Sequence, residues 1–151
     1  MVKIDISTKV RTSPQSVYSI LKDMSKFSAF MRDVKSIEAI KRISHSEIIT
    51  KWELDIDGTF IEWIEEDLFD IDRLSVKFRM IEGAFKKYEG AWLLVPISDG
   101  TQIKLSIVLD WGAPNFEKYV SHVLEEKVYR SLKSMLWLIR KRANKWTNSD
   151  L

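Results

Sequence analysis

The chain has 151 residues, of which 45% are hydrophobic and 30% charged, and its formal net charge is +2. A chain of this length forms one domain that buries about 68–70% of its unfolded surface, and a charge so near zero gives no reason to expect a nucleic acid or a membrane surface as partner. The absence of cysteine excludes disulfides, thiolate nucleophiles and zinc–thiolate sites.

The first third of the chain predicts a strand, two short helices and a second strand. Hydrophobic residues at every second position predict a strand over residues 2–10. Ser13 is suited to cap a helix and Pro14 to occupy its first position, so a short helix is expected to begin there. A second short helix is expected from Asp23 to Phe30, followed by a strand from Val34 to Ile43.

The middle of the chain predicts five more strands. Alternation of apolar and charged residues from Glu47 to Ile56 stops at Asp57-Gly58, a strong hairpin signal. Because the connections that follow are also short, neighbouring strands must be antiparallel. The remaining strands are expected over Thr59–Phe69, Leu74–Met80, Ala84–Ile97 and Thr101–Trp111.

A long amphipathic helix is predicted from Asn115 to Trp146. Its apolar residues recur every three or four positions and form one stripe, and a helix of this length spans roughly 48 Å. The only material left to cover the stripe is the sheet. We therefore expect one α+β domain over residues 1–151, in which a curved antiparallel sheet of about seven strands wraps around the helix and leaves space between the two.

Several short strings support this arrangement, in an order that is characteristic of one superfamily. They are residues 13–18 (SPQSVY), residues 23–27 (DMSKF), Trp63, Ile81-Glu82-Gly83, Gly90-Ala91-Trp92, Asp99-Gly100-Thr101, Met135-Leu136 and Ile139-Arg140. Together they resemble the START-like (SRPBCC) superfamily with the helix-grip fold, in particular its polyketide cyclase/dehydrase and coenzyme Q-binding-like branch. Ser28 stands where a proline is common in that family. The resemblance covers nearly the whole chain.

The resemblance implies a deep, largely apolar cavity between the sheet and the long helix, with the short helices near its mouth. Members bind sterols, lipids, quinones, plant hormones or polyketides, and some catalyse ring closure and dehydration. We therefore expect this chain to bind or carry a hydrophobic small molecule, without a cofactor or a metal ion. A polyketide aromatase/cyclase-type enzyme is the alternative, because fold alone does not settle function.

Strand alternation and helix spacing select the side chains that we expect to meet this ligand. Aromatic faces with a few polar tips suit a hydrophobic ligand, although side chains of this kind at regular spacing also form ordinary cores. The expected ligand-binding residues are Phe27, Phe30 and Met31 at the mouth, Trp52, Trp63, Phe78, Met80, Tyr88 and Trp92 on the sheet, and Ser131 and Met135 on the helix.

The strand over Thr59–Phe69 has two possible inner faces, and a shift of one residue exchanges them. One face carries Phe60, Glu62, Ile64, Glu66 and Leu68, and the other carries Ile61, Trp63, Glu65, Asp67 and Phe69. The family resemblance favours an inward Trp63. Glu65 would then enter the cavity, where burial would raise its pKa and make it an acid or a base. The orientation of Glu65 stays open, and we expect Asp67 to pair outside with Lys77 and Arg79.

Catalysis would require an ionisable group aimed into the cavity, and the candidates are Glu65, Tyr88 and Arg79. Arg79 alternates with Phe78, which favours the convex, exposed side of the sheet for the arginine. His45 and His122 have no evident carboxylate or serine partner and lend weak support to a triad or a metal site.

The remaining expectations concern location and assembly. The N-terminal residues lack the apolar core of a signal peptide, and the longest apolar run, Ala91 to Ile97, is too short to span a bilayer. A cytoplasmic protein without a transmembrane segment is therefore expected. The sequence leaves open whether it is a monomer or a homodimer.

Overall fold

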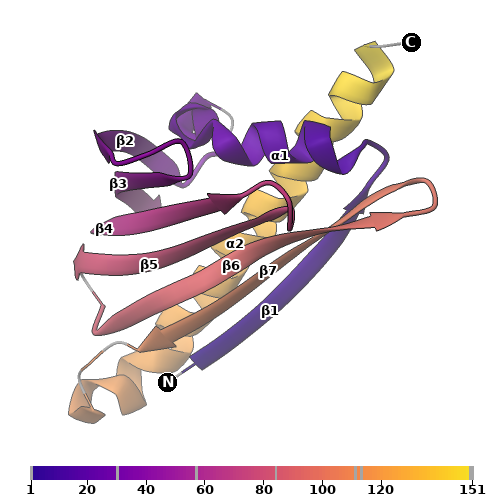
Figure 1. The fold of residues 1–151 in the computed structure, drawn as a ribbon. Helices are drawn as coiled ribbons and strands as arrows, with labels where there is room; N and C mark the ends of the chain where they lie inside the picture. Colours follow the sequence, from indigo (N-terminus) through magenta and orange to yellow (C-terminus); the bar gives the residue numbers. More distant parts are fainter. Residues whose placement is uncertain are drawn as a thin grey trace.

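The fold comes from a computed structural model that describes residues 2–29, 31–56, 58–83, 85–110, 112 and 114–149 (Figure 1). Side chains of the last helix are described at residues 126, 127 and 129–144. The elements follow in this order: β1 (Val2–Val10), α1 (Pro14–Lys22), the 3-10 helix η1 (Met24–Ala29), β2 (Val34–Arg42), β3 (Glu47–Ile56), β4 (Thr59–Asp70), β5 (Ser75–Gly83), β6 (Lys87–Ile97), β7 (Gly100–Asp110) and α2 (Pro114–Ser149).

The seven strands form one antiparallel sheet in the order β1-β7-β6-β5-β4-β3-β2. Only the pairing of β1 with β7 joins strands distant in sequence, and it aligns Ile4 with Ile107. Figure 1 shows the curved sheet with α2 running across one face and α1 across one end. The predicted α+β helix-grip architecture is confirmed, including the two short helices after the first strand.

Helix α1 begins where the sequence predicts. The Ser13 side-chain oxygen accepts a hydrogen bond from the Ser16 backbone N–H at 3.2 Å, and Pro14 occupies the first turn. A serine cap satisfies one of the free N–H groups of the first turn, and proline has no N–H to leave unpaired. The following residues form the 3-10 helix η1, which is tighter than an α-helix and is used in short pieces.

The connection between β5 and β6 differs from the prediction. Strand β6 begins at Lys87, whereas the sequence pattern predicted a start at Ala84, which lies outside the described residues. Gly83 pairs with Trp63 at a φ of 151°, and a methyl group on Gly83 would lie 2.5 Å from the Cβ of Trp63. The glycine therefore lets the end of β5 cross closely over Trp63. Phe85 lies in the connection, where it is buried.

The core lies between the inner face of the sheet and α2. Along β7 the inward residues alternate with outward ones, and Ile103, Leu105, Ile107 and Leu109 are all buried. Helix α2 meets them with a stripe of buried residues that recur every three or four positions: Leu132, Met135, Leu136, Ile139 and Ala143. The predicted stripe positions 116, 120, 124, 128 and 146 lie outside the described side chains. None of the helices that the structure describes is both long and apolar enough to cross a bilayer.

Candidate ligand-binding cavity

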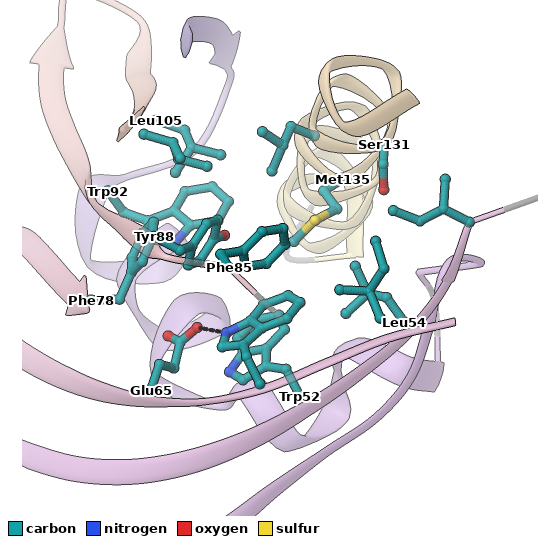
Figure 2. Close-up of a pocket in the computed structure, with 15 residues that line it drawn as sticks. Trp52, Leu54, Glu65, Phe78, Phe85, Tyr88, Trp92, Leu105, Ser131 and Met135 are labelled. Atoms are coloured by element: carbon teal, nitrogen blue, oxygen red, sulfur yellow. Dashed lines mark hydrogen bonds between the residues drawn. The ribbon is translucent and has the colours of Figure 1, made fainter. Parts of the chain in front are cut away.

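A cavity lies between the sheet and α2, and most of its wall is apolar (Figure 2). Strands β3 to β7 provide most of the lining, and one side of α2 completes it. The lining residues are Trp52, Leu54, Ile56, Ile61, Trp63, Glu65, Phe78, Phe85, Tyr88, Trp92, Leu105, Ile107, Ser131, Leu132 and Met135.

The cavity is narrow. The space open to the centres of water molecules is about 40 Å³, which is room for about three waters. Six of the fifteen side chains that line it are aromatic. A larger ligand must therefore displace side chains, and Met135 in the wall is an unbranched side chain that adapts readily.

Aromatic rings form a continuous wall on the sheet side. Trp52 and Trp63 are directly paired across β3 and β4, and their rings stack with centroids 5.5 Å apart. Tyr88 lies 5.1 Å from Trp63, 5.4 Å from Phe78 and 5.4 Å from Phe85, measured between ring centroids. Ring contacts of this kind stabilise the wall beyond simple area burial.

Gly90 in β6 makes room for this wall. A methyl group on Gly90 would lie 2.8 Å from the Cζ atom of Phe78 and 2.1 Å from the Ser106 carbonyl oxygen. Any larger residue would push the Phe78 ring away from its place against Tyr88. The glycine of the Gly90-Ala91-Trp92 string thus has a steric reason that the sequence alone does not show.

Helix α2 contributes small and flexible side chains. Ser131 is buried, and its hydroxyl donates a hydrogen bond to Asp33 Oδ2 at 3.0 Å. This bond ties the middle of α2 to the segment just before β2. Ser134, three residues further along the helix, is exposed.

Strand β4 turns Trp63, Glu65 and Asp67 inward. Glu65 is 2% exposed and Asp67 is fully buried, whereas Phe60 on the opposite face is 52% exposed. The inward orientation of Glu65, which the sequence left open, is thereby decided. The prediction that Asp67 points outward is wrong, because Asp67 shares the inner face with Trp63 at the period of two residues that a strand imposes.

Hydrogen bonds hold the two inward carboxyls. Trp63 Nε1 donates to Glu65 Oε1 at 2.7 Å (Figure 2). The Thr50 hydroxyl donates to Asp67 Oδ2, and Trp52 Nε1 donates to Thr50 Oγ1 at 2.9 Å. Asp67 Oδ1 is buried without a hydrogen-bond partner among the described residues.

Burial controls the protonation of this group. Burial raises the pKa of Glu65 well above its usual value, and the adjacent Asp67 raises it further. Burial also raises the pKa of Asp67, while hydrogen bonds from Glu65 and Thr50 lower it. Two buried carboxyls in contact do not both ionise. Burial therefore favours the protonated form of this pair, most strongly at Glu65.

Tyr88 is the third ionisable group at the cavity. Burial raises the pKa of its hydroxyl well above the usual value, and the negative charge of Glu65 and Asp67 raises it further. The phenol therefore keeps its proton near neutral pH and can act as a hydrogen-bond donor.

Arg79, the third catalytic candidate, lies outside the cavity. Its guanidinium pairs with Glu66 Oε2 at 3.0 Å on the outer face of the sheet. A direct catalytic role for Arg79 in this cavity is therefore wrong, and the expected convex position explains why. The pair joins β5 to β4 across the surface of the sheet.

The expected ligand-binding residues fall into three groups. Trp52, Trp63, Phe78, Tyr88, Trp92, Ser131 and Met135 line the cavity, although their role in binding stays a prediction. Phe27 and Met31 are buried in the core and were wrongly placed at the mouth; Phe27 packs edge-on against Trp52, with ring centroids 6.3 Å apart. Met80 is half-buried and is not part of the lining. Phe30 lies outside the described residues.

The sequence reasoning missed part of the wall. The missed lining residues are Ile56, Ile61, Phe85, Leu105, Ile107 and Leu132. Ile56 shares a strand face with Trp52, and Ile61 shares one with Trp63, so the period of two could have found these two. Leu105 and Ile107 lie on β7, from which no residue was selected. Phe85 carries no such signal because it lies in the connection after β5.

Comparison with known proteins supports the architecture. A family model described as "Polyketide cyclase / dehydrase and lipid transport" matches residues 10–136. Among curated proteins, no sequence matches the chain.

Solved structures with similar folds are numerous. The protein TTHA0849 from Thermus thermophilus is 23% identical, with a TM-score of 0.87 over 94% of this chain and 97% of that one. The Zhui aromatase/cyclase of a Streptomyces strain is 15% identical, with a TM-score of 0.85 over 95% and 94%. A STAR-related lipid transfer protein from Xanthomonas axonopodis is 13% identical, with a TM-score of 0.71 over 93% and 85%. At these identities the likeness shows the fold alone.

Proposed function

The chain belongs to the polyketide cyclase/dehydrase and lipid transport family, and from this premise we propose that it binds or carries a hydrophobic small molecule between the sheet and α2. The observation that carries the proposal is the wall of Trp52, Trp63, Tyr88 and Trp92, which faces α2 across a cavity. Pockets lined by aromatic side chains with a few placed polar groups are typical of small-molecule sites.

The narrowness of the cavity sets a condition on this proposal. Covering apolar surface with a ligand is favourable by about 25 cal/mol per Å² of surface removed from water. This free energy must exceed the cost of moving the side chains that fill the cavity. The ligand class therefore includes flat aromatic molecules, such as quinones and polyketide-like rings, that can stack on Trp63 or Tyr88. Lipids with one slender chain are the other candidates.

Native mass spectrometry of gently purified protein, followed by extraction under denaturing conditions, tests the proposal. A stoichiometric lipid, quinone or aromatic compound is the expected result. An empty protein that also leaves the fluorescence of N-phenylnaphthylamine unchanged would overturn it, because the aromatic side chains would then simply fill the core.

A pair of variants on α2 separates the cavity from the surface. Met135→Trp should fill the cavity and weaken binding of N-phenylnaphthylamine about tenfold or more, as overpacking removes the ligand's space. Ser134→Trp introduces the same side chain at the neighbouring exposed position and should bind the probe like the wild type. Circular dichroism establishes that both variants are folded.

A second candidate function is an aromatase/cyclase-type enzyme, and the inward carboxyl of Glu65 favours it. A buried acid beside the cavity can give a proton to a carbonyl of a bent poly-carbonyl chain or take one from its carbon. Glu65→Gln should then abolish turnover of such a chain while it still binds. Equal turnover in the variant would remove this candidate and leave binding intact.

Three further expectations stay predictions. They are a cytoplasmic location, independence from any cofactor, and a monomeric or homodimeric state. Size-exclusion chromatography with light scattering addresses the last of them directly.

A further inference from the structure

The cavity wall carries the carboxyl of Glu65 and, among the described residues, no basic side chain. Glu65 lines it, and Asp67 lies directly behind Glu65 on the same strand face. Among the described residues, no Lys, Arg or His belongs to the lining. Helix α2, which faces the pair, contributes only Ser131, Leu132 and Met135. The buried acidic pair therefore has no positive counter-charge within the cavity.

Hydrogen bonds satisfy this pair only in part. Trp63 Nε1 donates to Glu65, and the Thr50 hydroxyl donates to Asp67. Asp67 Oδ1 has no hydrogen-bond partner among the described residues. A buried carboxylate without a cation is expensive. An ammonium group would supply both the positive charge and the hydrogen-bond donors that this buried acidic pair lacks.

Aromatic ring faces reinforce this preference. Trp63 donates its indole N–H to the Glu65 carboxyl, and the ring centroids of Phe85 and Tyr88 lie 6.0 Å and 5.1 Å from that of Trp63. The faces of aromatic rings carry negative electrostatic potential and attract cations, most strongly where water is excluded. The carboxyl of Glu65 and these aromatic rings belong to the wall of the same cavity.

We propose that the ligand carries a protonated amine, which Glu65 binds while Trp63, Phe85 and Tyr88 surround it. This proposal rests on the proposed function and names its ligand class as an aromatic or aliphatic amine. On binding, the Glu65 proton passes to solvent, so that one ammonium replaces one proton and the net charge of the site does not change. The ammonium then forms an ion pair with the Glu65 carboxylate, and Asp67 keeps its hydrogen bond from Thr50. The negative charge of the ionised acidic pair disfavours an anionic ligand such as a fatty acid.

The groups that face Glu65 determine the pH dependence. They are Asp67 on β4 and the Tyr88 hydroxyl on β6; Glu66, on the outer face, adds negative charge near Asp67. Glu65 must release its proton when the ammonium binds. Affinity for an amine therefore rises as the pH increases from acid toward neutral, whereas affinity for an uncharged ligand stays level.

Three matched probes test the inference: phenethylamine, phenethyl alcohol and phenylacetate, which share a phenyl ring and differ in charge. Binding is measured by calorimetry and by fluorescence of the cavity tryptophans. We expect the amine to bind about tenfold more tightly than the alcohol and the carboxylate more weakly than either. Glu65→Gln should abolish the tighter binding of the amine and leave the affinity for the alcohol unchanged. Glu66→Gln, on the outer face, should leave the affinities for all three probes unchanged.

The outcomes separate this inference from the proposed function. Equal binding of amine and alcohol, or tightest binding of the carboxylate, would overturn the inference and leave the proposed function standing. If no probe binds and no hydrophobic compound is retained on purification, both fail. The ranking in the wild type decides the inference even where Glu65→Gln does not fold.

Discussion

The two faces of strand β4 both carry apolar and acidic residues, but the acidic residues are buried on the inner face and pair with a base on the outer face. On the inner face, Glu65 and Asp67 are buried, and burial raises the pKa of both carboxyls. On the outer face, Glu66 pairs with Arg79 at 3.0 Å in water. A single strand thus holds one acid pair whose protonation depends on burial and one acid whose charge is balanced by a neighbour.

This difference shows that the number of Asp and Glu residues in β4 does not predict the role of any one of them. Surface pairs contribute about 0–1 kcal/mol, whereas buried carboxyls respond to every change in desolvation and hydrogen bonding. Substitutions along this strand and its neighbour β3 test this difference between the two faces.

The largest effect is expected from removing an aromatic ring on the inner face. Trp63→Ala should lower the free energy of unfolding by about 3–5 kcal/mol, because it leaves a cavity beside Trp52 and Tyr88. Phe60→Ala, on the outer face, should cost less than about 1 kcal/mol. Urea denaturation measures both. Similar losses at the two positions would contradict the assignment of the faces.

A smaller loss is expected from Thr50→Val, which keeps the shape of the side chain and removes the hydroxyl. The variant takes away the donor to Asp67 and the acceptor for Trp52 Nε1, so the free energy of unfolding should fall by about 1–3 kcal/mol. Thr59→Val at the half-buried start of β4 serves as control and should change stability by a few tenths of a kcal/mol. Equal effects would mean that the hydroxyl of Thr50 does not support the acid pair.

The pH dependence of stability reports on Glu65. Its pKa is raised above the usual 4.5 in the folded state, so above that pH the unfolded chain loses the proton while the folded chain keeps it. The unfolding free energy therefore declines as the pH rises from about 4.5 toward the folded pKa. Glu65→Gln stays neutral and should flatten this decline in urea titrations at a series of pH values. An unchanged slope would show that Glu65 is ionised when folded.

The smallest effect is expected on the outer face. Glu66→Gln breaks the pair with the exposed Arg79 and should change the free energy of unfolding by about 0–1 kcal/mol, less at high salt. The same urea titration, with and without added salt, measures it. A loss as large as that of Thr50→Val would mean that the outer pair is not screened by solvent.

Much of the fold was readable from local pattern. The cap at Ser13 and Pro14, the alternation of β1 and β3, and the apolar stripe of α2 each depend on neighbours within a few residues. The order of elements and the short strings then indicated the helix-grip arrangement. Part of the cavity wall followed, since a strand that places Trp52 inward also places Leu54 inward.

Other features depended on residues far apart in the sequence. Both faces of β4 carry apolar and acidic residues, so its pattern fits either register, and only pairing with β3 turned Glu65 and Asp67 inward. Phe27 packs against Trp52 because η1 lies against β2, the neighbour of β3 in the sheet, which no spacing within residues 23–30 indicates.

The sequence by itself determined the elements, the caps and the class of fold, because these follow from interactions between residues that are close along the chain. Only the tertiary structure decided which carboxyls are buried, where Phe85 lies, and that the cavity is narrow. Burial and protonation depend on every side chain that packs around a group. At Glu65 those neighbours come from β3, from β4 itself, from β5 and from β6.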